Sequence, residues 1–488
     1  MAFEKQSMIW KDFYGGISQD DYLTTGKQVL YAENVDLTSS SDYVQMGKNS
    51  EWRYTTTDDV NGFIHAESWT SRDIFAYTKD GKIYDTSDWT VESSAIWAEI
   101  YTAFRFNGYL YFVSNHGTAP FSRITDANAH NNTSWASLSV NFTLTWDTIS
   151  SAWGKIYPVV SFLDEFFYIW IWSSVFKVSD WDVVEEFAIF DDNIVWLTRV
   201  GWVIKVFTER WTIAFWDGIS SSIDSFISAQ EPIRAVINAW KIDYIVAWHT
   251  DFQAKIKILN GYTLQQLNSA RYSTELAHSV WNIEITKPNQ LTKIWDTIYF
   301  CQDGVTWSDV YRFWTNNPVI KAWFNVALAK DSNWNQISET IKCLYWIEVT
   351  ATDQLYIWMY SNSQEAFERI DLNIDPTNAV YKTSWYMTLN PIDAWSKTTK
   401  KKIEYIMLST SNCSANETIE LQYSIDWAAF STVQTINSGT SLTRTEIYDH
   451  LDEFYELKFK VNFASGWSNA TPRLHEIKLV YSFVEDDG

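Results

Sequence analysis

Short strand-like runs recur along most of this chain, and their spacing restricts the fold more than any other feature of the sequence. The runs are rich in Val, Ile, Tyr, Phe and Thr and are separated by Gly, Asn, Asp and Ser, which is the pattern of an all-β protein. No segment longer than about ten residues keeps the i, i+3, i+4, i+7 apolar spacing of an amphipathic helix. In several runs a turn leads into an aromatic strand and then a second strand: 73–85, 106–115, 162–179, 199–217, 238–259, 293–313 and 344–361.

The starts of these runs lie about 35 to 55 residues apart, close to the roughly 40 to 50 residues of one four-stranded propeller blade. A small sheet of this size cannot bury both of its faces alone. Radial stacking in a ring supplies the missing core and leaves only short edges exposed. The sequence therefore predicts a β-propeller of about seven blades over residues 51–384.

The sequence changes character after about residue 385. Five stretches are typical of strands, and the last two alternate apolar and polar residues with period two, which indicates one buried and one wet face. These stretches are 402–410, 418–425, 430–436, 456–463 and 473–483. We expect a C-terminal β-sandwich over residues 385–488 and an N-terminal arm or leader over residues 1–50.

Tryptophan stands where turn chemistry calls for glycine. The chain has 29 Trp and 16 Gly among 488 residues, whereas glycine alone makes up about 7% of ordinary chains. Asp-Gly and Asn-Gly are the strongest hairpin signals. Two such pairs, Asp80-Gly81 and Asn107-Gly108, are matched by four pairs in which tryptophan takes the place of glycine: Asp88-Trp89, Asp180-Trp181, Asn333-Trp334 and Asp426-Trp427.

We hypothesise that the source genome reads UGA as glycine, and that many of these tryptophans are glycines. UGG codons at Trp89, Trp181, Trp295 and Trp427 would contradict the hypothesis. Trp52 and Trp216 have the context of authentic aromatic residues. The alternative is a protein that is rich in genuine tryptophan and exposes these rings as stacking platforms.

Charge and cysteine content exclude several classes of protein. The formal net charge is −23, which argues against a nucleic-acid-binding surface, because phosphate neutralisation needs clustered Lys and Arg. The basic run Lys400-Lys401-Lys402 is expected to be a solvated face. Cys301, Cys343 and Cys413 are odd in number and far apart, which indicates neither a disulfide framework nor a zinc site.

No apolar run approaches the roughly 18 residues of a bilayer span. The first residues carry Glu4, Lys5, Lys11 and Asp12, where a secretory signal would need an apolar stretch. We therefore expect no membrane span, and a protein that is made in the cytoplasm and kept or assembled there.

Sequence motifs of common active sites are absent. The chain has no G-x-S-x-G nucleophile elbow, no H-E-x-x-H, no P-loop and no G-x-G-x-x-G. Seven histidines, without an i, i+4 pair, are expected to be isolated: His65, His116, His130, His249, His278, His450 and His475. We predict that the protein is not an enzyme and has no catalytic, cofactor-binding or metal residues.

Three further features resemble parts of known sites only incompletely. The segment 126–130 alternates oxygen ligands like the start of a calcium loop but lacks the glycine and glutamate that complete one, so a polar loop is favoured. Ser424-Ile425-Asp426 with Phe430 resembles an incomplete Asp-box turn of sialidase-type propellers. Adjacent carboxylates of the kind that serve glycoside hydrolysis are expected by chance among 60 acidic residues: Asp20-Asp21, Asp58-Asp59, Asp164-Glu165, Glu185-Glu186 and Asp191-Asp192.

Three motifs suggest a family once turn tryptophans are replaced by glycine. The first is a glycine-leucine-threonine, glycine-glycine and aliphatic-strand pattern at 193–210. The second is an F-x-GG-I, A-x-NVD and K-G leader at 12–17, 32–36 and 46–48. The third is a Y-S-x-DGG-x-F hairpin at 423–430. The chain resembles tailed-bacteriophage virion proteins with a β-propeller and a C-terminal sandwich, of the tail hub, nozzle or head-closure type.

The resemblance implies a structural component of a phage tail or neck, assembled in the host cytoplasm and located in the virion. Its partners would be copies of itself, as a homo-oligomer, and neighbouring virion proteins. DNA would pass without specific binding, because an excess of Asp and Glu repels phosphate. The alternative function is a carbohydrate-binding or sialidase-like, glycan-processing β-propeller that uses exposed aromatic rings as sugar platforms.

Overall fold

The computed structural model describes residues 5–11, 16–17, 28–29, 31–32, 35–36, 42–46, 51–56, 58–67, 72–114, 121–130, 135, 138–142, 157–160, 166–171, 173–179, 184–201, 203–216, 225–239, 242–248, 254–266, 291–294, 297–303, 308–314, 323–328, 341–349, 352–361, 364–371, 384–389, 391–392, 398–448, 452–466 and 470–484. Their regular secondary structure is almost entirely β-strand. The helix α1 (Asp126–His130) is short, and none of the helices in the described part is long and apolar enough to cross a membrane.

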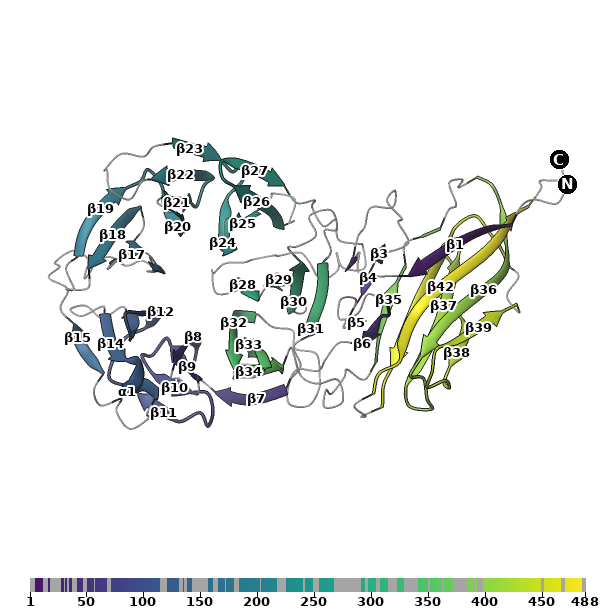
Figure 1. Ribbon diagram of the computed structural model, residues 1–488, viewed down its shortest axis with the longest axis horizontal. Helices are drawn as coiled ribbons and strands as arrows, with labels where there is room; N and C mark the ends of the chain where they lie inside the picture. Colours follow the sequence, from purple (N-terminus) through teal and green to yellow (C-terminus); the bar gives the residue numbers. More distant parts are fainter. Residues whose placement is uncertain are drawn as a thin grey trace.

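Seven antiparallel sheets of the described chain stand in a ring (Figure 1). Each blade has four strands, which are ordered from the centre of the ring to its rim; in the sixth blade two further strands extend the sheet. In chain order the blades are β8 (Val60–Glu67), β9 (Arg72–Thr78), β10 (Ile83–Asp85), β11 (Val91–Ser93); β12 (Ile100–Phe106), β13 (Tyr109–Ser114), β14 (Phe121–Thr125), β15 (Ser139–Phe142); β16 (Tyr157–Val160), β17 (Phe166–Ile171), β18 (Ser174–Ser179), β19 (Val184–Ile189); β20 (Ile194–Val200), β21 (Val203–Thr208), β22 (Thr212–Trp216), β23 (Ser225–Ser228); β24 (Ile233–Ala239), β25 (Ile242–Trp248), β26 (Ala254–Asn260), β27 (Thr263–Gln266); β28 (Leu291–Ile294), β29 (Thr297–Asp303), β30 (Ser308–Trp314), β31 (Trp323–Leu328); and β32 (Ile341–Val349), β33 (Thr352–Ser361), β34 (Gln364–Asp371), β7 (Glu51–Thr56).

The ring is closed in two ways. Each innermost strand contacts the innermost strand of the next blade, and β32 of the seventh blade contacts β8 of the first. The outermost strand of the seventh blade, β7, comes from the N-terminal side of the chain and pairs antiparallel with β34. This closed ring confirms the predicted all-β propeller of about seven blades.

In the described part of the ring, apolar side chains pack between neighbouring blades. Ile64 and Phe75 of the first blade pack in one cluster with Leu110 and Phe112 of the second. Trp170, which is fully buried, belongs to the cluster between the third and fourth blades. Burial of such side chains stabilises the fold by roughly 1.5–3 kcal/mol each.

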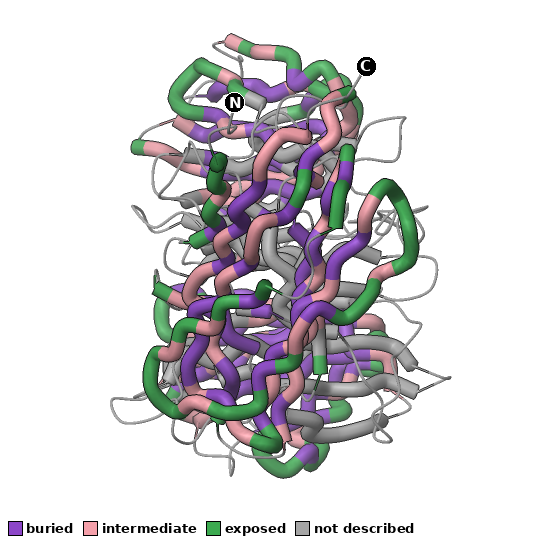
Figure 2. Tube along the Cα trace, turned by 90° about the vertical axis from the view of Figure 1, so that its right-hand side faces the viewer, coloured by how far each residue is buried: buried purple, intermediate pink, exposed green. Residues whose placement is uncertain are grey.

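The C-terminal residues build two further sheets beside the ring (Figure 1). One contains β1 (Gln6–Lys11), β42 (Arg473–Phe483), β36 (Lys401–Ser411), β39 (Thr443–Ile447) and β40 (Glu453–Phe454); the other contains β38 (Ser431–Ile436), β37 (Thr418–Ile425), β41 (Leu457–Ala464), β35 (Ser384–Thr388) and β4 (Tyr31–Ala32). Leu408 and Leu479 of the first sheet share one hydrophobic core with Leu421 and Val461 of the second. Buried and less buried residues alternate along these strands (Figure 2), as the period-two pattern predicts.

Residues 1–50, which we expected to form an arm or leader, supply strands to both parts of the molecule. β1 pairs with β42 over Gln6–Lys11 and contributes the fully buried Trp10. β2 (Gly16–Ile17) adds to β31 of the sixth blade, with β3 (Gln28–Val29) beside it. β4 pairs with β35, and β5 (Val35–Asp36), which pairs with β6 (Gln45–Met46), contacts both β31 and β35.

Candidate functional site

A chain of polar side chains joins three neighbouring blades at the innermost strands. The Tyr345 hydroxyl of β32 lies 2.5 Å from Nδ1 of His65 in β8, and Nε2 of His65 lies 3.7 Å from a carboxylate oxygen of Glu67. Glu67 and Asp126 both form ion pairs with Arg105 of β12. These five residues therefore link the seventh, first and second blades through side chains alone.

The alternation of β8 explains how these groups come to lie on one face. Ile64 and Ala66 are buried in the cluster that the first blade shares with the second. Phe63 and His65 point the other way, where their rings lie 5.9 and 6.1 Å from the ring of Tyr345. Successive side chains of a strand point to opposite faces. Phe63, His65 and Glu67 are alternate residues of β8 and therefore share one face.

The charges of these polar side chains are balanced around Arg105. Burial alone would lower the pKa of Arg105, but the hydrogen bonds to Asp126 and Glu67 outweigh it, and the pKa of Arg105 lies above its ordinary value. The arginine therefore stays charged and holds two carboxylates of neighbouring blades. Through these ion pairs Arg105 can bridge the first and second blades. No group of three His, Cys, Asp or Glu within the described ranges is placed to hold a metal ion.

A second charged contact crosses the interface of the fourth and fifth blades. Lys205 of β21 and Asp243 of β25 form an ion pair of 2.6 Å, and their side chains are 3% and 0% exposed. Asn238 of β24 donates a hydrogen bond of 2.7 Å to the other oxygen of Asp243. Removing one partner of such a buried pair leaves an uncompensated charge, which costs about 3–5 kcal/mol.

The structure gives the candidate calcium segment a structural role. Asp126 to His130 forms α1, where we expected a polar loop. Asp126 pairs with Arg105, and His130 pairs with Asp73 of β9. The charges of this segment are thus engaged with the first and second blades.

Both members of one adjacent carboxylate pair, and one member of another, face basic side chains. Asp58 binds Lys82 at 2.9 Å and also accepts the hydroxyl of Tyr84, while Asp59 binds Lys79. Asp192 of the pair Asp191-Asp192 lies 3.7 Å from Arg210. The side chains of Glu185-Glu186, and all of Asp20-Asp21 and Asp164-Glu165, lie outside the described residues, as do His116, His249, His278 and His450.

The basic run 400–402, which we expected to be a solvated face, is solvated only in part: Lys402 is exposed and Lys400 is partly exposed. Lys401 is fully buried, because alternate residues of β36 point into the core. Its ammonium group donates a 3.0 Å hydrogen bond to the Tyr455 carbonyl, and Lys400 forms a 2.5 Å ion pair with Glu453. The three adjacent lysines suggested a solvated face, but in a strand successive side chains point to opposite faces, so Lys401 is buried.

The Asp-box-like segment forms a tight turn. The carboxylate of Asp426 accepts the backbone N–H groups of Tyr455 and Glu456 at 2.9 and 2.8 Å. Asp426 and Trp427 both have positive φ, at 48° and 68°, as a two-residue hairpin turn requires. This carboxylate is therefore occupied by backbone.

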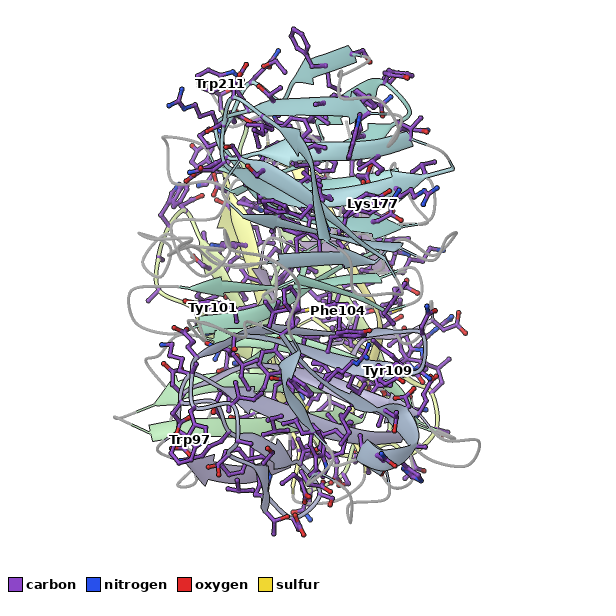
Figure 3. All side chains as sticks on the ribbon, turned by 90° about the vertical axis from the view of Figure 1, so that its left-hand side faces the viewer. Trp97, Tyr101, Phe104, Tyr109, Lys177 and Trp211 are labelled. Carbon is purple, nitrogen blue, oxygen red and sulfur yellow. The ribbon has the colours of Figure 1, made fainter. Side chains whose placement is uncertain are left out.

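Exposed tryptophans are the feature that the alternative, sugar-binding function would use. Trp97 is 82% exposed and Trp211 is 49% exposed, and the two lie toward the same side of the ring, opposite Tyr109 and Lys177 (Figure 3). Their exposure fits a stacking platform. The backbone of Trp97, however, has a φ of 55°, which is a conformation that favours glycine.

Trp211 lies in a turn whose hydrogen bonds match those of a glycine-containing turn. In the 78–82 turn of the first blade and the 208–212 turn of the fourth, the opening threonine accepts the N–H of the residue four positions later, at 2.9 and 3.1 Å. Each threonine hydroxyl also donates to the carbonyl of that residue. The fourth position of the turn is Gly81 in one case and Trp211 in the other.

No family model matches the chain, and no curated protein matches it. Solved propellers are similar in structure. The WD40 domain of Neurospora crassa Pan2 has 9% identity and a TM-score of 0.41, with 65% of this chain and 90% of that chain covered. The propeller domain of Myceliophteria thermophila Cps50 (Swd1) has 9% identity, a TM-score of 0.45, and 66% and 99% coverage. Saccharomyces cerevisiae Sqt1 has 9% identity, a TM-score of 0.43, and 67% and 100% coverage. At these values the likenesses carry no conclusion about this chain.

Proposed function

We propose that the protein is a structural component of a phage tail or neck that acts as a rigid β scaffold and not as an enzyme. The observation that supports this most is the position of the leader motif. Gly16-Ile17, Ala32 and Val35-Asp36 form β2, β4 and β5, which are strands that connect the propeller with the two C-terminal sheets. The leader motif, one of the three motifs that carry the family resemblance, thus supplies strands to both parts, and its strand β5 contacts both.

The closure of the molecule suits a part that bears load. The ring is locked by β7 through backbone hydrogen bonds, and the two-sheet part is locked by β1. A closed set of strands has few free edges, so it can present loops at fixed positions for assembly with copies of itself and with neighbouring proteins.

The proposal includes a gene in which UGA encodes glycine. It is supported by three tryptophans with positive φ, namely Trp89, Trp97 and Trp427 at 61°, 55° and 68°. A bulky residue in this region is a genuine outlier, whereas glycine occupies it freely. The codons of these residues test this part directly, and UGG at all three would refute it.

Immunogold labelling of purified particles tests the role itself. An antibody raised against the recombinant protein, translated with glycine at UGA, should label the tail or neck of intact particles. Labelling confined to material that remains in the supernatant would refute the proposal. A capsid-shell protein as a second target gives the positive control.

A second candidate is a glycan-binding propeller, favoured by the exposure of Trp97 and Trp211. A glycan array with the glycine-translated protein distinguishes it from the first. Specific binding of one sugar class would favour the glycan function. Binding that is present only in the tryptophan form would show that misread codons create the platforms.

A further inference from the structure

Arg473 and His475, at the beginning of β42, form a polar cluster with Tyr43 and Ser411. The Arg473 guanidinium lies 4.4 Å from the centre of the Tyr43 ring. The His475 ring lies 5.6 Å from the same ring, and its Nε2 lies 2.8 Å from Oγ of Ser411. Tyr43, Arg473 and His475 are partly exposed, so the cluster is open to solvent.

An irregularity of the sheet creates this cluster. β36 and β42 pair Ser409 with Glu476 but then Thr410 with Leu474, so that His475 has no partner across the ladder. A β-bulge of this kind re-aims a side chain, here toward Ser411. The bridge of Val44 to Leu474 brings Tyr43 to the same place from the N-terminal segment.

The charge of Arg473 is not balanced by a carboxylate in the described part of the chain. Its Nε is buried and has no hydrogen-bond partner. Arg105 and Arg210, by contrast, each face a carboxylate. Asp42, which precedes Tyr43, bonds to His475 through its backbone, and the charge of its carboxylate also acts on His475. An unpaired guanidinium is unexpected in a protein of net charge −23.

We propose that Arg473, His475 and Ser411 form a binding site for an oxyanion, either a carboxylate or a phosphate. A guanidinium binds two oxygens of such a group in a fork. Because Nε is buried, the two terminal nitrogens of Arg473 would form this fork. Stacking on Tyr43 fixes the plane of the fork. The hydroxyl of Ser411 adds a further hydrogen-bonding group at the side of His475. The proposal does not depend on a role in phage particles.

The favoured source of the oxyanion is an acidic segment of another protein molecule. The chain has its own acidic segment, 485–487, but it follows the opposite end of β42. That strand has 11 residues, so its ends lie roughly 33 Å apart, and Arg473 is at the end far from this segment. A second copy of the chain, or another acidic partner, can supply the carboxylate.

Binding measurements with two probes test the site and separate its two sources. Inorganic phosphate is titrated into the full-length protein by calorimetry, and a fluorescent peptide of residues 484–488 is titrated by anisotropy. We expect saturable binding of at least one probe, weakened about tenfold or more in Arg473→Gln. Arg444→Gln, which removes an exposed arginine of the same sheet, is the matched control and should bind like the wild type.

The outcomes decide between the alternatives. Tighter binding of the peptide supports a carboxylate partner, and tighter binding of phosphate supports a free anion. Failure of both probes to bind, or equal binding by wild type and Arg473→Gln, would overturn the proposal. Arg473→Lys, which keeps the charge but loses the fork, should bind more weakly than wild type while it unfolds at a similar temperature, and equal affinity would count against the fork.

Discussion

At the scale of single residues, two groups of tryptophans differ in environment, while Trp89 combines a buried ring, 8% exposed, with a positive φ of 61°. Trp10, Trp170 and Trp216 are at most 1% exposed and pack in strands, as genuine aromatic residues do. Trp97 and Trp427 are each 82% exposed and have the positive φ that favours glycine. The conformations of the second group indicate positions chosen for backbone freedom, since a side chain in this region costs about 1–2 kcal/mol.

Replacing an exposed tryptophan of the second group should stabilise the protein. We expect Trp427→Gly and Trp97→Gly each to raise the free energy of unfolding by about 1 kcal/mol, because strain is removed and little buried surface is lost. Urea unfolding measures the change. Trp216→Gly is the control and should destabilise by about 3–5 kcal/mol, since it empties a core site. A loss of stability in both exposed variants would contradict this explanation.

The sequence pointed to some of these residues but not to all. Trp89 and Trp427 follow aspartate, which is half of a hairpin signal, and both have positive φ. Trp97 follows Ile96, and Trp211 follows Arg210, so neither is marked by its neighbours. Their positions became visible only from backbone angles and from the repeated threonine turn, which are properties of the folded chain.

At the scale of strands, neighbouring blades are joined by apolar clusters and by a few charged contacts. The strand period predicted the apolar clusters. It could not predict that Lys205 would meet Asp243, because these residues lie 38 positions apart on different blades. Nor could it predict the polar contacts that run from Tyr345 through His65 and Glu67 to Arg105. Contacts between blades depend on which strand faces which, and local sequence patterns do not contain that information.

The buried ion pair between the fourth and fifth blades makes a direct prediction. Asp243→Ala should destabilise the protein by about 3–5 kcal/mol, because it leaves the Lys205 ammonium buried and unpaired. Equilibrium unfolding in urea measures this. The double variant Lys205→Met with Asp243→Leu removes both charges and should recover most of the stability. If the double variant is as unstable as the single one, lost packing and not the orphaned charge is the cause.

The link between β42 and the N-terminal segment should respond to pH. Burial lowers the pKa of His475 below its ordinary value of 6.5, the charge of Arg473 acts in the same direction, and the backbone of Asp42 opposes them. Between the lowered folded pKa and 6.5 the unfolded chain binds more protons. The free energy of unfolding should therefore decrease as the pH falls through this window and level off below it.

His475→Gln should remove this contribution to the pH dependence. Urea unfolding between about pH 5 and pH 7.5, in a buffer without phosphate, compares the variant with the wild type. We expect a shallower loss of stability toward acid in the variant. A steeper loss in the variant would mean that His475 is protonated more readily in the folded state, contrary to the burial argument.

At the scale of the whole molecule, segments far apart in the sequence close both parts. The number of blades and the all-β class followed from the spacing of strand runs. The role of residues 1–50 did not, since Gln6 pairs with Tyr481 and no local pattern predicts a partner at such a distance. Two-residue strands such as β2 and β4 are also too short to leave a periodic signal.

Removal of the N-terminal segments should open the molecule. A chain that begins at residue 57 lacks β7 and leaves β34 with a free edge, and an exposed edge promotes association through backbone hydrogen bonds. Size-exclusion chromatography should show aggregates for this chain and a defined species for the full-length protein. A truncated chain that stays defined in size and unfolds at the same temperature would show that closure by β7 is dispensable.

Cryo-electron microscopy of the intact particle tests the proposed role most directly. The account predicts a seven-bladed ring joined to a two-sheet part in the density of the tail or neck, with the turns at 89, 97 and 427 lacking an indole ring. A tail and neck whose density is fully explained by other proteins would contradict it.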